Sequence, residues 1–436
     1  MSNRSRELVG IVLAATIASI ALTTVVLAQD VAATSRALTW GALFLGLYVI
    51  AHVVVRRTVP YADGALLPLT AVLTGFGLVT IYRLDENDGL RQAAWVAVGV
   101  GALAAALIWL RHDYRVLEQY RYLFGVAAVV LLLLPSLPGL GKRVNGARLW
   151  VDLGPLQFQP GELAKICLIV FLAAYLREKR EVLAQGRLKD FGPLLAIWGA
   201  AMLVIVTTND LGSALLNFGI FLAMLYVATG RTLYVAAGLG LFVGGAAALY
   251  NAIGHVRERV TIWLHPWTDE KVYCTLNGQL ELRQDCASYQ LVKSLYSIGN
   301  GGFWGTGLGE GTFSSTDGSP LIPYLRTDFV FSAIGQELGL VGAAALLLVF
   351  MLFVVRGMRI ALRAQDGFSK LAATGLTFGF ALQTFIIVGG IVRIVPLTGI
   401  TLPFVSYGGT SIVANFLLLA GLLLISNRAN ALGGRE

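Results

Sequence analysis

Long apolar runs constrain the fold of this chain more than any other feature of its sequence. A run of about 18 or more apolar residues is long enough to cross the hydrocarbon core of a bilayer as a helix. Inside lipid the backbone must satisfy its own hydrogen bonds, so such runs form helices and not open sheets. We therefore expect an all-α, polytopic integral membrane bundle. The sequence contains twelve candidate spans, at residues 8–28, 37–55, 65–82, 92–110, 121–137, 160–176, 192–208, 211–229, 232–250, 326–355, 371–394 and 409–426.

The composition agrees with a membrane protein. Of the 436 residues, 56% are hydrophobic and only 13% are charged, whereas soluble domains carry about 25% charged residues. The net charge of +8 would suggest nucleic acid as a partner in a soluble protein. Here the basic residues flank apolar runs, which is the pattern that orients membrane helices. We therefore expect membrane lipids as partners and no nucleic acid.

The basic residues of the short loops predict the orientation. Clusters such as Arg56–Arg57 and Arg177–Arg180 fall on the same side as both termini, and that side is expected to be cytoplasmic. The opposite side carries the longest polar segment, residues 251–325. The first apolar run, Leu8 to Ala28, is longer than the apolar core of a signal peptide. We expect it to be retained as a helix.

Several classes of function are excluded by missing motifs. The sequence has no HExxH and no GxSxG, so a zinc protease and a serine hydrolase are not indicated. The glycine-rich run at residues 299–311 lacks the Lys-Ser/Thr ending of a phosphate-binding loop, and no nucleotide is expected. Cys274 and Cys286 share the long polar loop. We predict that they form a disulfide if the loop faces an oxidising compartment.

Two candidate features lie near the start of the sixth span. Residues 141–160 mix basic side chains, including Arg148, with aromatic ones. This mixture is typical of an interfacial segment and equally of a cradle for an anionic lipid headgroup. Glu162 and Lys165 are three residues apart, which places both on one helix face. They form either a structural ion pair or a cation directed at a phosphate, with the carboxylate orienting it.

Polar residues also mark the starts of two other spans. Asn209 and Asp210 open the eighth span, and either side chain is expected to cap it. Asp328, at the start of the tenth span, is either a cap or a carboxylate that faces an outer cavity and acts as a base or holds a divalent cation. Glu337 lies about 13 Å deeper and needs a partner that the sequence does not identify.

Irregular backbone is predicted between the last two spans. Residues 393–411 contain Pro396, Pro403, Gly408 and Gly409. Non-helical backbone near membrane depth is tolerated only where protein buries it or where it lines a cavity. The segment therefore predicts a formed pocket at the outer end of the bundle.

Together these segments resemble the SEDS family, which comprises the RodA and FtsW proteins of bacterial cell-wall synthesis, over roughly residues 66–427. Six motifs occur in the family order: NGARLWVDLG, FQPGELAK, NDLGSALL, SYQLVKSLYSIGNGGFWGTGLGEG, LRTDFVFSAIGQELGLVG and PLTGITLPFVSYGGTS. The sequence departs from the family pattern at Gly161, Asn209, Lys293, Arg326 and Gln336. Lys293 stands where the family has Gln, which puts any role carried over to that position in doubt.

The resemblance implies a ten-helix core at residues 65–427, preceded by a two-helix extension at 1–64 and followed by a short cytoplasmic tail at 428–436. It implies a peptidoglycan glycosyltransferase that polymerises lipid II, with undecaprenyl pyrophosphate leaving and with inversion at the anomeric carbon. The family's catalytic aspartate falls on Asp328. Substrate-binding positions fall on Glu162, Lys165, Arg148, Gln290 and Ser406, of which Arg148 and Lys165 are our candidates for the pyrophosphate.

The resemblance also implies partners and a location. A class B penicillin-binding protein is the expected transpeptidase partner, and the bacterial cytoplasmic membrane is the expected location. A divalent cation, magnesium or manganese, at Asp328 would share the stabilisation of the pyrophosphate. Three other functions are considered, namely a division-type FtsW paralogue, a lipid II flippase and a scaffold with a decayed site. The short C-terminal tail and the extra N-terminal helices favour a RodA-type elongation enzyme.

Overall fold

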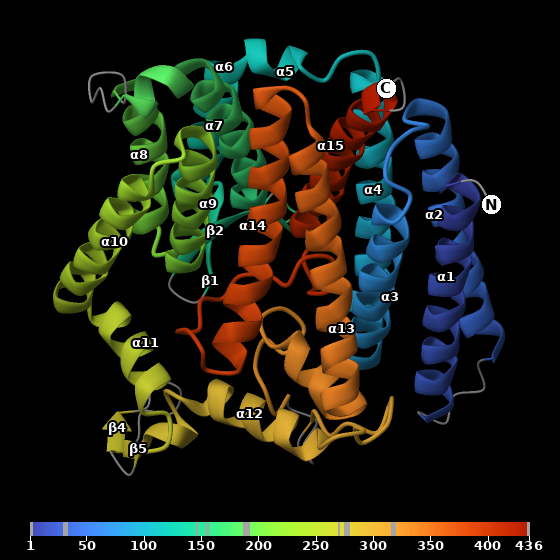
Figure 1. Ribbon diagram of the computed structural model, residues 1–436. Coiled ribbons are helices and arrows are strands. Elements are labelled where there is room, and N and C mark those ends of the chain that lie inside the picture. Colours follow the sequence, from blue (N-terminus) through green and yellow to red (C-terminus); the bar gives the residue numbers. More distant parts are fainter. Residues whose placement is uncertain are drawn as a thin grey trace.

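Each of the twelve predicted spans corresponds to a helix in the computed structural model, which describes residues 3–28, 34–144, 147–152, 154, 157–185, 192–268, 271–273, 280–314 and 320–433. The helices stand side by side in an upright bundle (Figure 1). They are α1 (Asn3–Ala28), α2 (Thr34–Thr58), α3 (Leu66–Leu84), α4 (Glu86–Leu110), α6 (Arg121–Leu133), α7 (Pro160–Ala184), α8 (Gly192–Thr207), α9 (Leu211–Thr229), α10 (Thr232–Ala252), α13 (Val330–Arg363), α14 (Gly367–Ile391) and α15 (Gly409–Gly433).

The predicted all-helical membrane bundle is confirmed. Nine helices of the described chain are long and apolar enough to be identified as spans by themselves. The helices α6 and α8 are apolar but shorter. The C-terminal turns of α7 carry the charged stretch from Arg177 to Glu181, which lowers its hydropathy. The last helix, α15, continues to Gly433, into the segment expected to be a tail.

The centre of the bundle is formed by α14 and α15, in which 72% and 83% of the apolar span is buried within the protein. Four phenylalanines from three helices and one loop meet here. The ring centroids of Phe353 in α13 and Phe380 in α14 lie 4.3 Å apart. Those of Phe404 in the loop and Phe416 in α15 lie 5.4 Å apart. Phe404 belongs to the irregular segment between α14 and α15, so this aromatic cluster anchors that segment to the core.

The helices α1 and α2 stand at one side of the bundle (Figure 1), where α1 packs against α3 and α2 packs against α4. At one end of this pair, Arg4 donates hydrogen bonds to the carbonyl oxygens of Val59 at 2.7 Å and Ala62 at 3.0 Å. Glu7 is paired with Arg4 and also contacts Nδ1 of His52 at 2.7 Å. This buried cluster fixes α1 to α2 and to the connection that leads into α3.

The loops at the two ends of the bundle contain the remaining elements. The short α5 (Val116–Gln119) lies at the opposite end of the bundle from α11 (Gly254–Leu264) and α12 (Tyr289–Gly301) (Figure 1). An antiparallel sheet of β1 (Gly141–Val144), β2 (Ala147–Asp152) and β3 (Gln157–Phe158) leads directly into α7. A second pair, β4 (Lys271–Tyr273) and β5 (Leu280–Leu282), belongs to the long polar loop. Cys286 is disulfide-bonded, whereas Cys274, its predicted partner, lies outside the described residues.

Candidate functional site

The irregular backbone predicted between the last two spans is present, from Val392 to Gly408. Gly399 adopts a φ of 74°, and Arg393 and Phe404 adopt φ values of 64° and 63°. Residues other than glycine seldom adopt this left-handed backbone conformation. The segment is therefore held in shape by its surroundings, and the contacts below show what holds it.

Glu162 and Lys165 form a buried ion pair in the N-terminal turns of α7, with 2.8 Å between Nζ and Oε2. Lys165 also donates to Oε1 of Gln383 in α14 at 2.6 Å. Gln383 in turn donates to the carbonyl oxygen of Thr401 at 2.8 Å. The hydroxyl of Thr401 lies 2.8 Å from that of Ser411 and donates to Glu162 at 3.4 Å. The pair is thus one part of a polar network that joins α7, α14, α15 and the irregular segment.

Asp328 lies in the turn before α13 and not within its first helical turn. The cap position is Phe329, and its side chain makes no capping hydrogen bond. The turn is closed by hydrogen bonds from the amides of Thr327 and Asp328 to the carbonyl oxygen of Tyr324, at 3.1 and 3.0 Å. Of the two settings considered for Asp328, the helix cap is therefore not observed.

The irregular segment holds the turn that carries Asp328. The hydroxyl of Ser406 donates to the carbonyl oxygen of Thr327 and accepts from the amide of Leu402 at 2.9 Å. The amide of Tyr407 donates to the carbonyl oxygen of Arg326 at 2.9 Å. Gly399 faces the carboxyl group so closely that a Cβ atom at this position would lie 3.6 Å from Oδ2 of Asp328.

Arg259 of α11 is a member of the site that sequence reasoning missed. Its Nη1 donates to the carbonyl oxygens of Leu397 at 3.3 Å and Thr398 at 3.2 Å. Its positive charge acts on both Asp210 and Asp328. The only sequence signal was a pair of arginines, 257 and 259, in a loop too long for the charge rule to interpret.

Burial sets the protonation of the two carboxyl groups near Arg259. It raises the pKa of Asp328 to about 6, against the lowering effects of a hydrogen bond with Thr327 and of the Arg259 charge. Burial also raises the pKa of Asp210, while hydrogen bonds with Ser213 and the charge of Arg259 lower it. Asp210 accepts from the amide of Ser213 at 3.0 Å, so the predicted cap of α9 is present.

Two further arginines brace this end of the bundle. Arg326 pairs with Asp85 at 2.8 Å and with Asp88, at the turn between α3 and α4. Arg83 supplies the partner that Glu337 needs, at 3.1 Å, and donates to the carbonyl oxygens of Gly309 and Gly311 at 2.7 and 2.9 Å. The glycine-rich run at residues 299–311 is therefore bound to α3 and α13.

The glycine-rich run also completes a break in α13. The helix is non-helical at Gly339, with φ 65° and ψ −166°. The amides of Leu340 and Val341 donate to the carbonyl oxygens of Gly302 and Phe303, at 3.0 and 3.2 Å. A Cβ atom at Gly305 would lie 2.2 Å from the carbonyl oxygen of Glu337, so only glycine permits this approach.

Two predicted substrate-binding residues stand apart from these contacts. Arg148 is exposed on β2, and Gln290 is half-buried on α12. Among the hydrogen bonds of the described residues, none joins either side chain to Asp328 or to the Lys165 network. Within the same part of the chain, no group of three His, Cys, Asp or Glu side chains could hold a metal ion. Asp328 alone does not make a complete divalent-cation site.

Comparison with known proteins identifies a family. The model of the FTSW_RODA_SPOVE family, described as cell cycle protein, matches residues 64–431. The chain is 39% identical to the peptidoglycan glycosyltransferase RodA of Mycobacterium tuberculosis, over 98% of this chain and 91% of that protein. It is 32% identical to the stage V sporulation protein E of Bacillus subtilis, over 85% of this chain and 98% of that protein.

Solved structures show the same fold. A chain of a peptidoglycan synthase complex, studied for its coordination of polymerization and crosslinking, is 27% identical with a TM-score of 0.68, covering 85% of this chain and 98% of that one. The rod shape determining protein RodA of Thermus thermophilus is 25% identical with a TM-score of 0.59, covering 84% and 96%. Both similarities extend through most of the bundle described above.

Proposed function

The chain belongs to the FtsW, RodA and SpoVE family of cell cycle proteins, and we propose that it is a RodA-type peptidoglycan glycosyltransferase that polymerises lipid II. Four mycobacterial relatives named as peptidoglycan glycosyltransferase RodA are 38–39% identical over 89–98% of this chain. Relatives named as FtsW are 31–32% identical over 84–86%. The greater similarity favours elongation over division.

One structural observation carries the mechanism. The irregular segment between α14 and α15 touches the turn of Asp328 through Ser406 and the buried Glu162–Lys165 pair through Thr401. A carboxyl group and an ammonium group are thereby fixed to the same short segment. Transfer of a sugar from a pyrophosphate needs both kinds of group, a base for the attacking hydroxyl and a positive charge near the leaving group.

The proposed step assigns the proton to Asp328. Its carboxylate takes the proton of the 4-hydroxyl of the acceptor GlcNAc, and that oxygen forms a bond to the anomeric carbon of the donor MurNAc. The bond from that carbon to the phosphate oxygen breaks, and undecaprenyl pyrophosphate leaves with the electron pair. A pKa of about 6 suits this task, because the group is ionised at neutral pH and is a stronger base than an ordinary aspartate.

The other predicted residues take different parts in this proposal. Lys165, already bonded to Glu162 and Gln383, provides a pre-positioned charge. Arg148 is exposed on its hairpin and offers a guanidinium group to the pyrophosphate. Ser406 is buried and engaged on both sides, so we assign it the positioning of the Asp328 turn in place of substrate contact. Gln290 remains a proposed contact to the sugar.

A divalent cation at Asp328 also remains a proposal. The side chains there do not complete a metal site in the described part of the chain. Oxygens of the substrate pyrophosphate would have to supply further ligands, as is usual for magnesium. Polymerisation that persists after chelation with EDTA would exclude the cation.

The comparisons support a proposal for the partner, and the basic residues of the short loops support one for the location. One structural relative works within a complex that polymerises and crosslinks peptidoglycan. We propose a class B penicillin-binding protein as the partner here, and the cytoplasmic membrane, with both termini inside, as the location. A flippase is less well supported, because the ionisable groups of the site, Asp328, Glu162 and Lys165, lie near the starts of α13 and α7 and not along the spans.

The test is polymerisation of labelled lipid II by the purified protein, with and without its transpeptidase. Asp328→Asn keeps the size of the side chain but removes the base. We expect loss of glycan product by about 100-fold or more with unchanged binding of the transpeptidase. Full polymerisation by the variant would exclude Asp328 as the base, and absence of product from the wild type with its partner would exclude the proposed function.

A further inference from the structure

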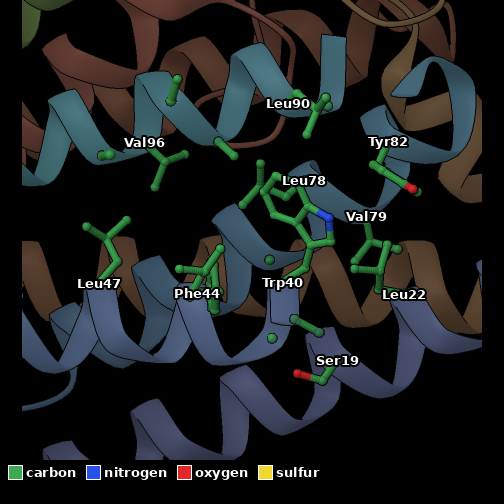
Figure 2. Close-up of a pocket in the computed structure, with 18 residues that line it drawn as sticks. Ser19, Leu22, Trp40, Phe44, Leu47, Leu78, Val79, Tyr82, Leu90 and Val96 are labelled. Atoms are coloured by element: carbon green, nitrogen blue, oxygen red, sulfur yellow. The ribbon is translucent and has the colours of Figure 1, made fainter. Parts of the chain in front are cut away.

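An apolar groove of about 420 Å³ lies between α1, α2, α3 and α4, and one of its ends lies next to the α3–α4 turn that pairs with Arg326. Figure 2 shows Trp40 of α2 in its middle, beside Leu78 and Val79 of α3, with Phe44 and Leu47 on one side and Val96 and Leu90 of α4 on the other. All four helices are among those identified as spans, so the groove lies at membrane depth. The matched family region starts at residue 64, so two of its four walls lie outside that region.

Close helix contacts form the floor of the groove. A Cβ atom at Gly41 would lie 2.0 Å from Oγ of Ser19, and one at Gly75 would lie 3.1 Å from Cβ of Ala18. The helices therefore touch at these small residues and separate above them. Two lining residues, Leu43 and Leu90, are 60% and 38% exposed, so the groove opens on the outer surface of the bundle.

The position and lining of the groove indicate its occupant. Its walls are almost entirely apolar, they belong to four membrane-spanning helices, and the groove opens on the outer surface of the bundle. A single hydrocarbon chain is thin enough to enter. Apolar cavities stay dry and bind apolar molecules, so water does not fill the groove.

The charges at one end of the groove indicate the headgroup. Tyr82, Gly89 and Leu90 line this end, next to the turn that carries Asp85, Glu86 and Asp88. Two arginines pair with these acids, Arg326 with Asp85 and Asp88, and Arg91 with Asp88 at 3.3 Å. Three carboxylates and two guanidinium groups leave an excess of negative charge. This excess favours a headgroup that carries an ammonium group and has no net charge over a pyrophosphate, which carries several negative charges.

We infer that the groove binds an acyl chain of a membrane phospholipid, with an amine-bearing headgroup such as that of phosphatidylethanolamine at the α3–α4 turn. The bound chain completes the packing between the N-terminal helix pair and the rest of the bundle. It is a structural lipid site, distinct from the proposed binding of lipid II. The inference therefore does not depend on the proposed glycosyltransferase activity.

The experiment uses the full chain in vesicles of phosphatidylethanolamine and phosphatidylglycerol that contain a phosphatidylethanolamine with a photoreactive acyl chain. Labelled residues are located by mass spectrometry of peptides from α2 and α4. Ala97→Phe fills the groove, because Ala97 lines it. Val98→Phe is the matched control, because Val98 is 53% exposed and does not line the groove. We expect about tenfold weaker labelling of residues 40–47 in Ala97→Phe and no change in Val98→Phe.

Thermal unfolding gives a second measurement if Ala97→Phe folds poorly, with Ala94→Leu as a second groove-filling variant. Added phosphatidylethanolamine should raise the Tm of delipidated wild type and of Val98→Phe, but not that of the filled variants. Equal labelling of all variants, or an equal rise in Tm, would show ordinary boundary lipid and overturn the inference. Displacement of the label by undecaprenyl pyrophosphate would also overturn it, by assigning the groove to a polyprenyl chain.

Discussion

Two buried ionic clusters in this protein have opposite surroundings. One cluster, formed by Arg4, Glu7 and His52, lies among regular helices. There Arg4 donates hydrogen bonds to backbone carbonyl oxygens of the connection to α3. Glu162 and Lys165 instead meet an irregular segment and link three helices through Gln383 and Thr401. Burial of charge is therefore not what distinguishes a site. The difference is that the second cluster is tied to strained, non-helical backbone next to a titratable carboxyl group.

The strongest test of this contrast replaces one cationic side chain in each cluster with the neutral side chain of methionine. Lys165→Met should lower lipid II polymerisation by about 100-fold, because a pre-positioned charge near the leaving group is lost. Arg4→Met should lower thermal stability but leave the activity of the folded protein within about twofold, because it is remote from the site. Rates per folded molecule, measured with unfolding curves, separate the two effects. Equal losses of activity would remove the proposed distinction.

A pH profile tests the carboxyl group itself. Asp328 must be ionised to act as a base, so polymerisation should fall as the pH drops below about 6. Arg259 lowers this pKa, so in Arg259→Gln the acid limb should move to higher pH. A move of one unit would lower the rate at pH 6 by about fivefold, because the ionised fraction of the carboxyl group falls from about one half to about one tenth. Arg259→Lys should restore most of the wild-type profile. An unchanged limb in Arg259→Gln would assign that limb to another group.

The substitution Glu337→Gln tests the Arg83–Glu337 ion pair, which lies outside the polar network of Lys165. Removing the charge leaves Arg83 without its carboxylate in a largely buried setting and should cost about 3 kcal/mol of stability. Arg91→Gln is the control, because Arg91 is exposed in its pair with Asp88 and should cost under about 1 kcal/mol. Denaturation of the two variants in detergent gives the comparison. Similar stabilities would mean that the Arg83–Glu337 pair contributes little.

The smallest expected effect is at Gly399. Gly399→Ala places a side chain at a φ of 74° and should cost about 1 kcal/mol, with a modest fall in activity because the turn faces Asp328. Gly46→Ala in α2 meets no atom within 4 Å and should be neutral or slightly stabilising. A fully active and equally stable Gly399→Ala would show that the segment tolerates change beside the carboxyl group.

The parts of the fold that depend on local sequence could be predicted. The apolar runs gave the helices, and the three-residue spacing of Glu162 and Lys165 gave their pairing. The cap formed by Asp210 was equally local. Asp328 was misplaced within a helix, because the apolar run continues across the turn that precedes α13. Its true setting depends on contacts with Ser406 and Tyr407, which are far away in the sequence.

Long-range partners could not be predicted for a physical reason. Gln383 is one of several polar residues in a mostly apolar helix, and Arg259 is one of several charges in a long loop. Neither has a spacing that distinguishes it from a surface residue or a helix-packing residue. The same holds for Arg83, whose role depends on the approach of the glycine-rich run to α13. Only the packing of distant segments gives these side chains their partners.

At the break of Gly339, α13 is joined to the long polar loop, so that the two segments are expected to move together. Residues 302–307 are hydrogen-bonded to α13 on both sides of the break, through Gln336 and Glu337 before it and Leu340 and Val341 after it. A bend of α13 at Gly339 would lengthen these hydrogen bonds, and a displacement of the loop would bend the helix at Gly339. The short section of α13 before the hinge directly follows Asp328. A partner that binds the long polar loop would therefore move the section of α13 next to Asp328, which is about three helical turns long.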